Sequence, residues 1–267
     1  MGSVIATLRG RLLRAIILLL TAGVAPLSAS GRDVANIAAA SDLKFALEEA
    51  AARFKEQTNH EVKLSFGSSG NFFHQIAEGA PFQMFLSADE SLVFKLADQG
   101  LTRDRGALYA IGRIVLFAPH GSPLKPDAEF KDLKAALADG RIRHFAIANP
   151  EHAPYGRAAE QALKSQGLWE AIKPTLVLGE NVSQAAQFAS GGSAQGGIIP
   201  YSLSLAPAVK QLGSFALLPE EWHAPLRQRM VLTNSAGETA KAFYKFVQEP
   251  TAREIFKRYG FVLPGRT

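Results

Sequence analysis

The sequence predicts an α/β fold with two lobes, each a mostly parallel β-sheet flanked by helices, and a ligand cleft between the lobes. Strand-like and helix-like segments alternate along the chain, which is typical of parallel sheets covered by helices. The alternation forms two series, separated by a Pro- and Gly-containing loop at residues 119–123. A strand-like segment at residues 230–234 follows the second series and is expected to return the chain to the first lobe.

The first series covers residues 34–99. Its expected helices carry apolar residues at helical spacing, such as Leu43, Leu47 and Phe54, and its expected strands are short apolar or alternating runs. In order, it comprises strands at 34–39, 62–66 and 82–87, and helices at 42–57, 71–78 and 90–99.

The second series begins after a long apolar strand at residues 114–119. It comprises strands at 145–148, 175–178 and 197–199 and helices at 157–164 and 183–189, and two helices at 238–248 and 251–259 end the chain. We expect lobe one to comprise residues 31–117 plus 228–267, and lobe two to comprise residues 118–227. Closure of the lobes is expected as a hinge motion near Ala118 and Leu226.

Residues 1–30 have the layout of a secretory signal peptide. Arg9, Arg11 and Arg14 form a basic start, residues 15–20 are an unbroken apolar run, and residues 28–30 are small. The apolar run ends by Pro26, short of the ~20 residues that a membrane-spanning helix needs. We therefore expect a cleaved signal and a periplasmic mature protein.

Charge and composition narrow the possible partners. The net charge of +5 falls to +2 without the three arginines of residues 1–30, and no later stretch interleaves basic and aromatic residues, so no nucleic-acid partner is expected. The chain has no cysteine, which excludes disulfides, cysteine-ligated metals and a lipid-anchored cysteine. Its six histidines include no pair at helical metal-ligand spacing. We expect no cofactor and no residue that ligates a metal directly.

Four short polar segments lie where an expected strand ends and an expected helix begins. They are Ala-Ser-Asp at 40–42, Gly-Ser-Ser-Gly-Asn at 67–71, Ala-Pro-Tyr-Gly at 153–156 and Glu-Asn-Val-Ser at 180–183. A helix start offers unpaired N–H groups and the positive end of the helix dipole to an anion. In open α/β sheets, ligands bind beyond the carboxyl ends of the strands. The four segments therefore predict a cradle for a small oxyanion, built from hydroxyl and N–H donors.

Taken singly, the residues of these segments allow other roles. Ser41 can donate its hydroxyl to a ligand or merely cap its own helix. Ser69, between Gly67 and Gly70, fits an anion nest or a surface turn. The phenol of Tyr155 can reach across the cleft or pack under a loop, and Val182 can offer a free N–H or serve only the core.

A secreted serine hydrolase is the competing class of function. It would use Ser69 or Ser41 with His152 and an acid such as Asp42. The segment around Ser69 is not a nucleophile elbow, because Asn71 stands where that motif needs glycine. We therefore expect a binding protein and not an enzyme.

Six longer stretches carry a family resemblance. They are AAASDL at 38–43, FGSSGN at 66–71, GAP at 79–81 with SAD at 87–89, NPEHAPYGRAA at 149–159, GENVSQA at 179–185 and EIFKRYGF at 254–261. In this order they resemble the periplasmic molybdate-binding proteins of ABC transporters, which are type II periplasmic binding proteins. The resemblance covers nearly all of the expected mature chain.

The resemblance implies that a monomer captures molybdate or tungstate between its lobes and delivers it to an ABC permease in the membrane. Ser41 and Ser69 match two hydroxyl ligands of lobe one. Tyr155, through its side chain or N–H, and Val182, through its N–H, match ligands of lobe two. The molybdenum would be held as its oxyanion by these residues, and another oxyanion such as sulfate is the alternative ligand.

Asp42 departs from the family pattern, because an acid beside Ser41 is unfavourable near an anion. We expect its carboxylate to cap helix N–H groups and face away, so that Asp42 contributes only its backbone N–H. A carboxylate facing inward would repel a dianion unless it were paired with Lys44 or with a protonated oxygen.

A second departure concerns a tyrosine ligand that some family members place in a later strand. That position is Pro200 here, and Tyr201 follows one residue on. Strand alternation would turn Tyr201 to the other face, so we expect Tyr155 to substitute, with Tyr201 in reserve.

Overall fold

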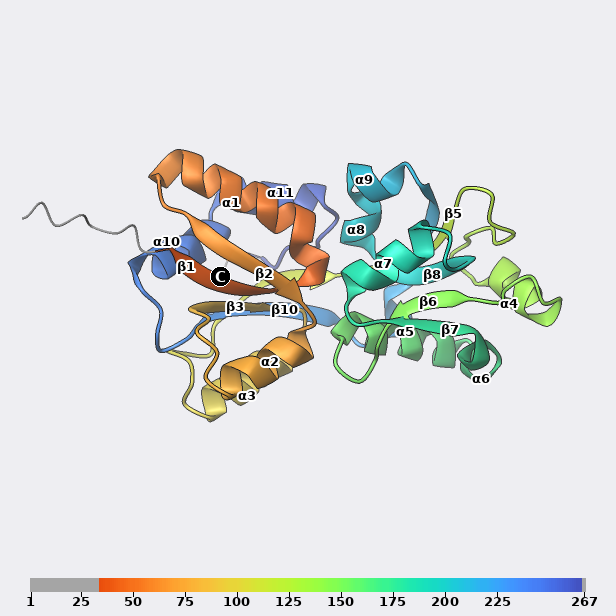
Figure 1. Cartoon of the computed structure of the whole chain (residues 1–267), viewed down its shortest axis with the longest axis horizontal. Helices are drawn as coiled ribbons and strands as arrows, with labels where there is room; N and C mark the ends of the chain where they lie inside the picture. The colour runs from red at the N-terminus through yellow and green to blue at the C-terminus, as the bar shows by residue number, and fades with distance from the viewer. Residues whose placement is uncertain (1–33, 266–267) are drawn as a thin grey trace, which may run out of the picture. The chain divides into compact units, whose positions relative to one another are not determined.

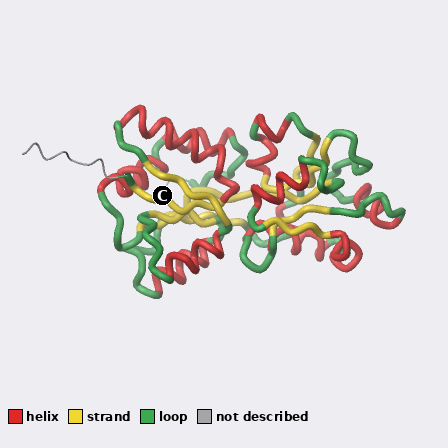
Figure 2. Tube along the Cα trace, in the orientation of Figure 1, coloured by secondary structure: helices red, strands yellow, loops and turns green. Residues whose placement is uncertain are grey.

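The structure, a computed structural model, describes residues 34–265. The expected signal peptide therefore lies outside the described residues. These residues belong to one compact unit and form two five-stranded sheets, ordered β2-β1-β3-β10-β4 and β7-β6-β8-β5-β9. Figure 2 shows the strands gathered into two separate groups with helices around them. The expected α/β architecture of two helix-flanked sheets is confirmed.

The first sheet, with its helices, is called lobe one below. Its strands are β1 (Ala35–Ala40), β2 (Val62–Gly67), β3 (Met84–Ser87), β4 (Ala107–Gly112) and β10 (Leu226–Leu232). Strand β10 runs antiparallel to both neighbours, and the other four strands share one direction. Helices α1 (Lys44–Thr58), α10 (Glu238–Val247) and α11 (Pro250–Arg258) cover one face, and α2 (Ser69–Ala77) and α3 (Glu90–Asp98) cover the other (Figure 1).

The second sheet, with its helices, is called lobe two. Its strands are β5 (Ile114–Pro119), β6 (Phe145–Ala148), β7 (Leu176–Gly179), β8 (Gly196–Pro200) and β9 (Gly213–Leu217). Here β5 alone opposes the common direction. Helices α7 (Val182–Ser190), α8 (Tyr201–Leu205) and α9 (Pro207–Lys210) lie on one side, and α5 (Pro154–Ser165) and α6 (Trp169–Ile172) on the other; α4 (Lys131–Ala138) follows β5 (Figure 1).

Strand β1 shows why the sequence forms this core. Its residues Ala35, Ile37 and Ala38 are fully buried, since helices cover both faces of the sheet. An unbroken apolar run is the pattern expected of such a central strand. Three short 3-10 helices, η1 (Ser41–Leu43), η2 (Lys173–Thr175) and η3 (Glu220–Trp222), complete the described elements.

The chain crosses between the lobes at two places, and one differs from the prediction. The first crossing lies at Arg113, between β4 of lobe one and β5 of lobe two. Ala118, the expected hinge position, lies instead inside β5 and pairs with Ser214 of β9. The second crossing ends at Leu226, where β10 begins. The expected lobe boundaries, between residues 117 and 118 and between residues 227 and 228, would therefore cut strands β5 and β10. They differ from the structure because strand pairing, and not loop composition, determines where the chain crosses.

Candidate oxyanion-binding site

Four helix starts meet at one small cavity between the lobes. Strands β1 and β2 lead into η1 and α2 in lobe one, and β6 and β7 lead into α5 and α7 in lobe two. The cavity has a volume of about 10 Å³ and is lined by Ala40, Ser41, Asp42, Gly67, Ser68, Ser69, Ala88, Ala153, Pro154, Tyr155 and Val182. All five residues predicted from the sequence are therefore brought together. The volume is far below that of a pocket for a drug-sized ligand, roughly 300 Å³ or more, so only a ligand of a few atoms suits it.

Ser69, the first residue of α2, keeps a free hydroxyl proton. Its Oγ accepts a hydrogen bond from the N–H of Ala88 at 3.0 Å, which leaves its O–H to donate elsewhere. Ser68 caps the same helix, because its Oγ accepts from the N–H of Asn71 at 3.3 Å. Ser68 also lines the cavity. Ser68 was not predicted as a site residue, although its hydroxyl next to Ser69, in the segment between Gly67 and Gly70, could have indicated it.

Ser41 does not cap its own helix. The cap position of η1 is Ala40, and no side chain of the described residues bonds to this helix start. The Ser41 hydroxyl instead donates to Oδ1 of Asn181 in lobe two at 3.3 Å, and the Ser183 hydroxyl donates to the Ser41 carbonyl at 3.1 Å. The purely local role of Ser41 is thereby excluded.

Two main-chain donors of lobe two stand at the cavity. Asn181 caps α7 and accepts the N–H groups of Ser183 and Gln184, which leaves the N–H of Val182 as the donor at the first position of the helix. Tyr155 is the second residue of α5, where a helix has no internal acceptor for its N–H either. Asn181 was missed as a site residue, although an asparagine before a helix is a known cap signal.

The side chains of Asp42 and Tyr155 bond to each other, which corrects the expected orientation of Asp42. The Tyr155 hydroxyl donates to Oδ2 of Asp42 at 2.9 Å, so the carboxylate neither caps a helix nor faces away. Lys44, the expected partner, pairs with Glu48 on the exposed side of α1. Because the Tyr155 hydroxyl proton is used by Asp42, the N–H of Tyr155 is its remaining donor for a ligand.

Gln228 and Tyr109 complete this buried cluster. The Gln228 amide donates to Oδ2 of Asp42 at 2.6 Å and to the Tyr155 oxygen at 2.9 Å, and its Oε1 accepts from the Tyr109 hydroxyl at 2.8 Å. The pairing of β10 with β4 shifts register between Gln228 and Arg229. Neither Gln228 nor Tyr109 was predicted. A glutamine in phase with Leu226 and Met230 on an otherwise apolar strand face was the available signal.

Burial makes Asp42 an unusual carboxyl group. Loss of hydration raises its pKa from 3.8 to about 6, and the hydrogen bonds from Gln228 and Tyr155 lower it in part. The N–H groups of Asp42 and Leu43 also lower it, although neither forms a hydrogen bond with Oδ1, which is buried without a partner in the described part of the chain.

Tyr201 does not reach the cavity. It begins α8 instead of continuing β8, and its ring packs against Phe215 and next to Gly260. Pro200 ends β8 opposite Ile114 and is buried. The reserve role of Tyr201 is therefore not supported.

The lobes touch around the cavity. The N–H of Gly70 donates to the His152 carbonyl at 2.9 Å, and a side chain at this glycine would meet that oxygen at 2.5 Å. The Asn71 amide donates to the Glu180 carboxylate at 2.5 Å. The imidazole of His152 bonds to the Glu180 carbonyl at 2.9 Å, so within residues 34–265 no hydrogen bond joins it to a cavity serine.

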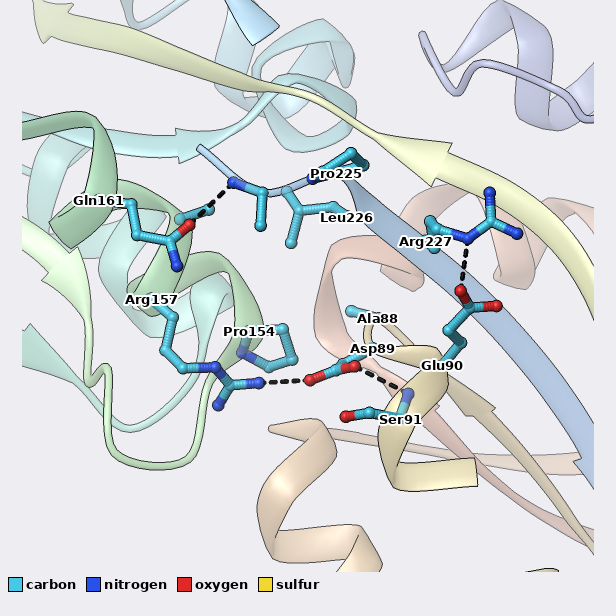
Figure 3. A pocket seen from close by; sticks show the side chains of 12 residues that line it. Ala88, Asp89, Glu90, Ser91, Pro154, Arg157, Gln161, Pro225, Leu226 and Arg227 are labelled. Carbon is cyan, nitrogen blue, oxygen red and sulfur yellow. Dashed lines mark hydrogen bonds and ion pairs between the residues drawn. The ribbon is translucent and has the colours of Figure 1, made fainter. Parts of the chain in front are cut away.

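A second hollow lies beside the crossing strands, between α3, α5 and the start of β10 (Figure 3). Its charged side chains are already paired, Arg157 with Asp89 at 2.6 Å and Arg227 with Glu90. The hydroxyl and N–H donors converge on the smaller cavity instead, and we place the ligand site there. The Arg157–Asp89 pair joins α5 of lobe two to the cap of α3 in lobe one.

The sequence and fold match known proteins. The profile of the bacterial extracellular solute-binding proteins matches residues 35–262. The molybdate-binding protein ModA of Rhodobacter capsulatus is 37% identical over 248 residues, which cover 92% of this chain and 94% of that protein. The ModA of Azotobacter vinelandii is 34% identical over 251 residues, 93% of this chain and 97% of that protein.

The fold of this chain also matches solved structures of binding proteins. The periplasmic molybdate-binding protein of Azotobacter vinelandii superposes with a TM-score of 0.77 at 35% identity, covering 86% of this chain and 100% of that one. The sulfate-binding protein SubI from Mycobacterium tuberculosis shares the fold alone, with a TM-score of 0.68 at 16% identity over 85% of this chain and 86% of that one. Fold and site define a two-lobed solute-binding protein. The chain belongs to the bacterial extracellular solute-binding proteins and, within them, to the ModA family of molybdate-binding proteins, which confirms the family resemblance.

Two further observations concern the described residues only. None of their helices combines the length and the apolar character needed to cross a membrane. Between residues 34 and 265, no three histidine or acidic side chains cluster as a metal site would require.

Proposed function

We propose that this protein captures molybdate or tungstate in the cavity between its lobes and delivers it to an ABC permease. The observation that carries the proposal is the meeting of four helix starts at one buried cavity lined by serine hydroxyls. A buried oxyanion must regain hydrogen bonds for the water it loses, and hydroxyl and N–H donors supply them. The relatives named molybdate-binding protein support this ligand.

The donors have distinct roles in this proposal. The hydroxyl of Ser69 binds the anion from lobe one, together with the backbone N–H of Asp42 and the hydroxyl of Ser41, which turns from Oδ1 of Asn181 to the anion. The N–H groups of Tyr155 and Val182 bind it from lobe two, and their helix dipoles favour its negative charge. The molybdenum itself contacts no side chain, because its oxygens face the protein.

The remaining expectations belong to the same proposal. The protein acts in the periplasm as a monomer, after removal of its signal peptide, and binds its ligand without a cofactor and without chemical turnover. The family membership supports an extracytoplasmic binding role. The hydrogen bonding of His152 to Glu180 gives a serine hydrolase no support.

Isothermal titration calorimetry of residues 31–267 tests the ligand. Molybdate and tungstate are expected to bind with one-to-one stoichiometry and a Kd in the micromolar range or tighter, about −8 kcal/mol or better. Sulfate, which is smaller, is expected to bind more weakly. Heat from sulfate with none from molybdate would keep the fold and overturn the ligand; no heat from any of the three anions would overturn the proposal.

A further inference from the structure

The carboxyl group of Asp42 lies where a negative charge is doubly unfavourable. Asp42 lines the cavity and is only 1% exposed, and its Oδ1 has no hydrogen-bond partner among residues 34–265. Burial disfavours the charged form of a carboxyl group, and a bound dianion nearby disfavours it further. Both effects act in the same direction, toward protonation.

No cation offsets this charge within the described part of the chain. Helix η1, which holds Asp42, packs against α1, α7, α8 and β2. Helix α7 has no titratable side chain, α8 has only Tyr201, and β2 has only the exposed Lys63. The charged groups nearest on α1, on α5, on β10 and at the cavity rim bond elsewhere: Lys44 to Glu48, Arg157 to Asp89, Arg227 and Arg229 to Glu90, and His152 to Glu180.

The surrounding hydrogen bonds fix which oxygen of Asp42 can carry a proton. The Gln228 oxygen accepts from the Tyr109 hydroxyl, so its amide N–H groups face Asp42 and Tyr155. Burial raises the pKa of the Tyr155 phenol well above its ordinary range, so this group remains a donor. Oδ2 of Asp42 therefore accepts two hydrogen bonds, and a proton can reside only on Oδ1, the oxygen without a partner.

Some of these hydrogen bonds can form only when the two lobes are together. Asp42 belongs to lobe one and Tyr155 to lobe two, and Gln228 and Tyr109 lie on β10 and β4, the strands next to the two crossings. Separation of the lobes would remove Tyr155 and admit water to Asp42. A hydrated carboxyl returns toward its ordinary pKa, so the open protein holds fewer protons than the closed one.

We propose that Asp42 takes up a proton from solvent when the lobes close on the oxyanion, so that anion binding is coupled to proton uptake. The inference rests on the proposed function. The proton joins Oδ1, turning this oxygen into a hydrogen-bond donor and leaving the cavity wall neutral. Because the closed, anion-bound protein holds more protons, affinity is highest at low pH and falls as the pH rises.

Calorimetry of residues 31–267 with sodium molybdate, in buffers of different ionisation enthalpy at pH 7.0, measures the protons taken up per anion. Wild type is expected to take up a large fraction of one proton, and its Kd to rise by up to about tenfold per pH unit between pH 6.0 and 8.5. The Asp42→Asn variant keeps the acceptor oxygen for Tyr155 and Gln228. It is expected to show no uptake, a Kd independent of pH, and tighter binding than wild type at pH 8.5.

His152→Gln is the matched control, since His152 is the histidine next to the cavity-lining Ala153, and it should keep the proton uptake. Tight molybdate binding by wild type without uptake, or equal uptake by Asp42→Asn, would overturn the inference. Absence of molybdate binding by wild type would instead overturn the proposed function. If Asp42→Asn does not fold, the variant Tyr155→Phe tests the inference instead. This variant removes one hydrogen-bond donor to Asp42, so the dependence of the Kd on pH should move to higher pH. An unmoved profile would contradict the inference.

Discussion

Most donors at the cavity have a hydrogen-bond environment that leaves them able to serve an anion, whereas the Ser41 hydroxyl must first leave Oδ1 of Asn181. Ser69 is the clearest case, because its oxygen already accepts from Ala88 and its proton has no other role in the described residues. A hydrogen bond to a charged group contributes about 1.5–3 kcal/mol. Removal of the Ser69 hydroxyl therefore measures directly how much a single donor contributes to the affinity for the anion.

The variant Ser69→Ala is expected to raise the Kd for molybdate about 10- to 100-fold, since one charge-assisted hydrogen bond is lost. Calorimetry measures the change. Ser190→Ala is the control, because Ser190 ends α7 away from the cavity and bonds only to the Ala186 carbonyl. Equal affinities of the two variants would exclude Ser69 as a ligand.

Asp42 makes the stability of the protein depend on pH while the lobes are closed. Its pKa is raised from 3.8 to about 6 in the closed protein, so the closed state binds more protons than the unfolded state between these values. The free energy of unfolding of a protein that stayed closed would therefore fall as the pH rises from 4 to 7, by about 3 kcal/mol in full. The open, anion-free protein is expected to lack this dependence, because its Asp42 is hydrated.

Urea unfolding of wild type and Asp42→Asn at pH 4 and pH 8 checks this dependence. Without the anion, the stability of wild type relative to the variant should stay nearly constant between the two pH values. A decrease of about 3 kcal/mol would show that Asp42 stays buried without the anion and would contradict the proton uptake.

At the scale of elements, the first turn of α2 sets how closely the lobes approach. A methyl group at Gly70 would lie 2.5 Å from the His152 carbonyl oxygen and 3.0 Å from its Cα, both on the other lobe. Alanine suits a helix better than glycine, so lobe one itself should tolerate the change. The substitution acts on closure and not on folding.

Gly70→Ala is accordingly expected to weaken molybdate binding by about 1–3 kcal/mol, the usual cost of overpacking, while the melting temperature of the anion-free protein stays within a few degrees. Asn71→Ala is the neighbouring control and removes only one exposed hydrogen bond to Glu180. Unchanged affinity in Gly70→Ala would mean that the lobes do not close as the structure shows.

The ion pair between α5 and the start of α3 predicts that the affinity for molybdate depends modestly on salt concentration. Arg157 and Asp89 are partly exposed, with 38% and 27% of their side chains accessible, so their pair contributes at most about 1 kcal/mol to closure. Arg157→Gln is expected to weaken binding by less than tenfold and to flatten its response to sodium chloride. Arg141→Gln, whose ion pairs stay within lobe two, should leave both unchanged. A steep salt response remaining in Arg157→Gln would indicate a cation at the ligand.

The elements show what local sequence can and cannot predict. The strands and helices of the repeating units were predicted within a few residues, because each carries a full hydrophobic period. Strands β4 and β9 and the helices α4, α6, α8 and α9 were missed, since segments of four to eight residues with mixed patterns contain too little periodicity. Tyr201 was assigned to a strand, but the pairing of β8 ends at Pro200.

The residues of the candidate site also differ in whether a local sequence signal predicts them. The four helix starts were predictable, because a strand end followed by polar residues and a helical pattern is a local signal. Gln228 and Tyr109 come from strands that the sequence separates widely and that antiparallel pairing brings together, with Gln228 opposite Ala110. The inward orientation of Asp42 depends on these two residues and on Tyr155, so it could not be predicted from the segment that contains it.

For the whole molecule, the two crossings at Arg113 and before Leu226 permit a hinge motion between otherwise compact lobes. An anion that contacts both lobes binds the closed state better and shifts the population toward it. Small-angle X-ray scattering of residues 31–267 is expected to show a smaller radius of gyration after molybdate is added. An unchanged radius in protein saturated with molybdate would mean that binding does not require closure.

The central claim is that one oxyanion binds where the four helix starts meet, and anomalous diffraction from crystals grown with tungstate tests it most directly. The account predicts a single strong tungsten peak within the cavity lined by Ser41, Ser69, Tyr155 and Val182. A peak in the hollow beside the crossing strands, or no peak in crystals of protein saturated with tungstate, would contradict it.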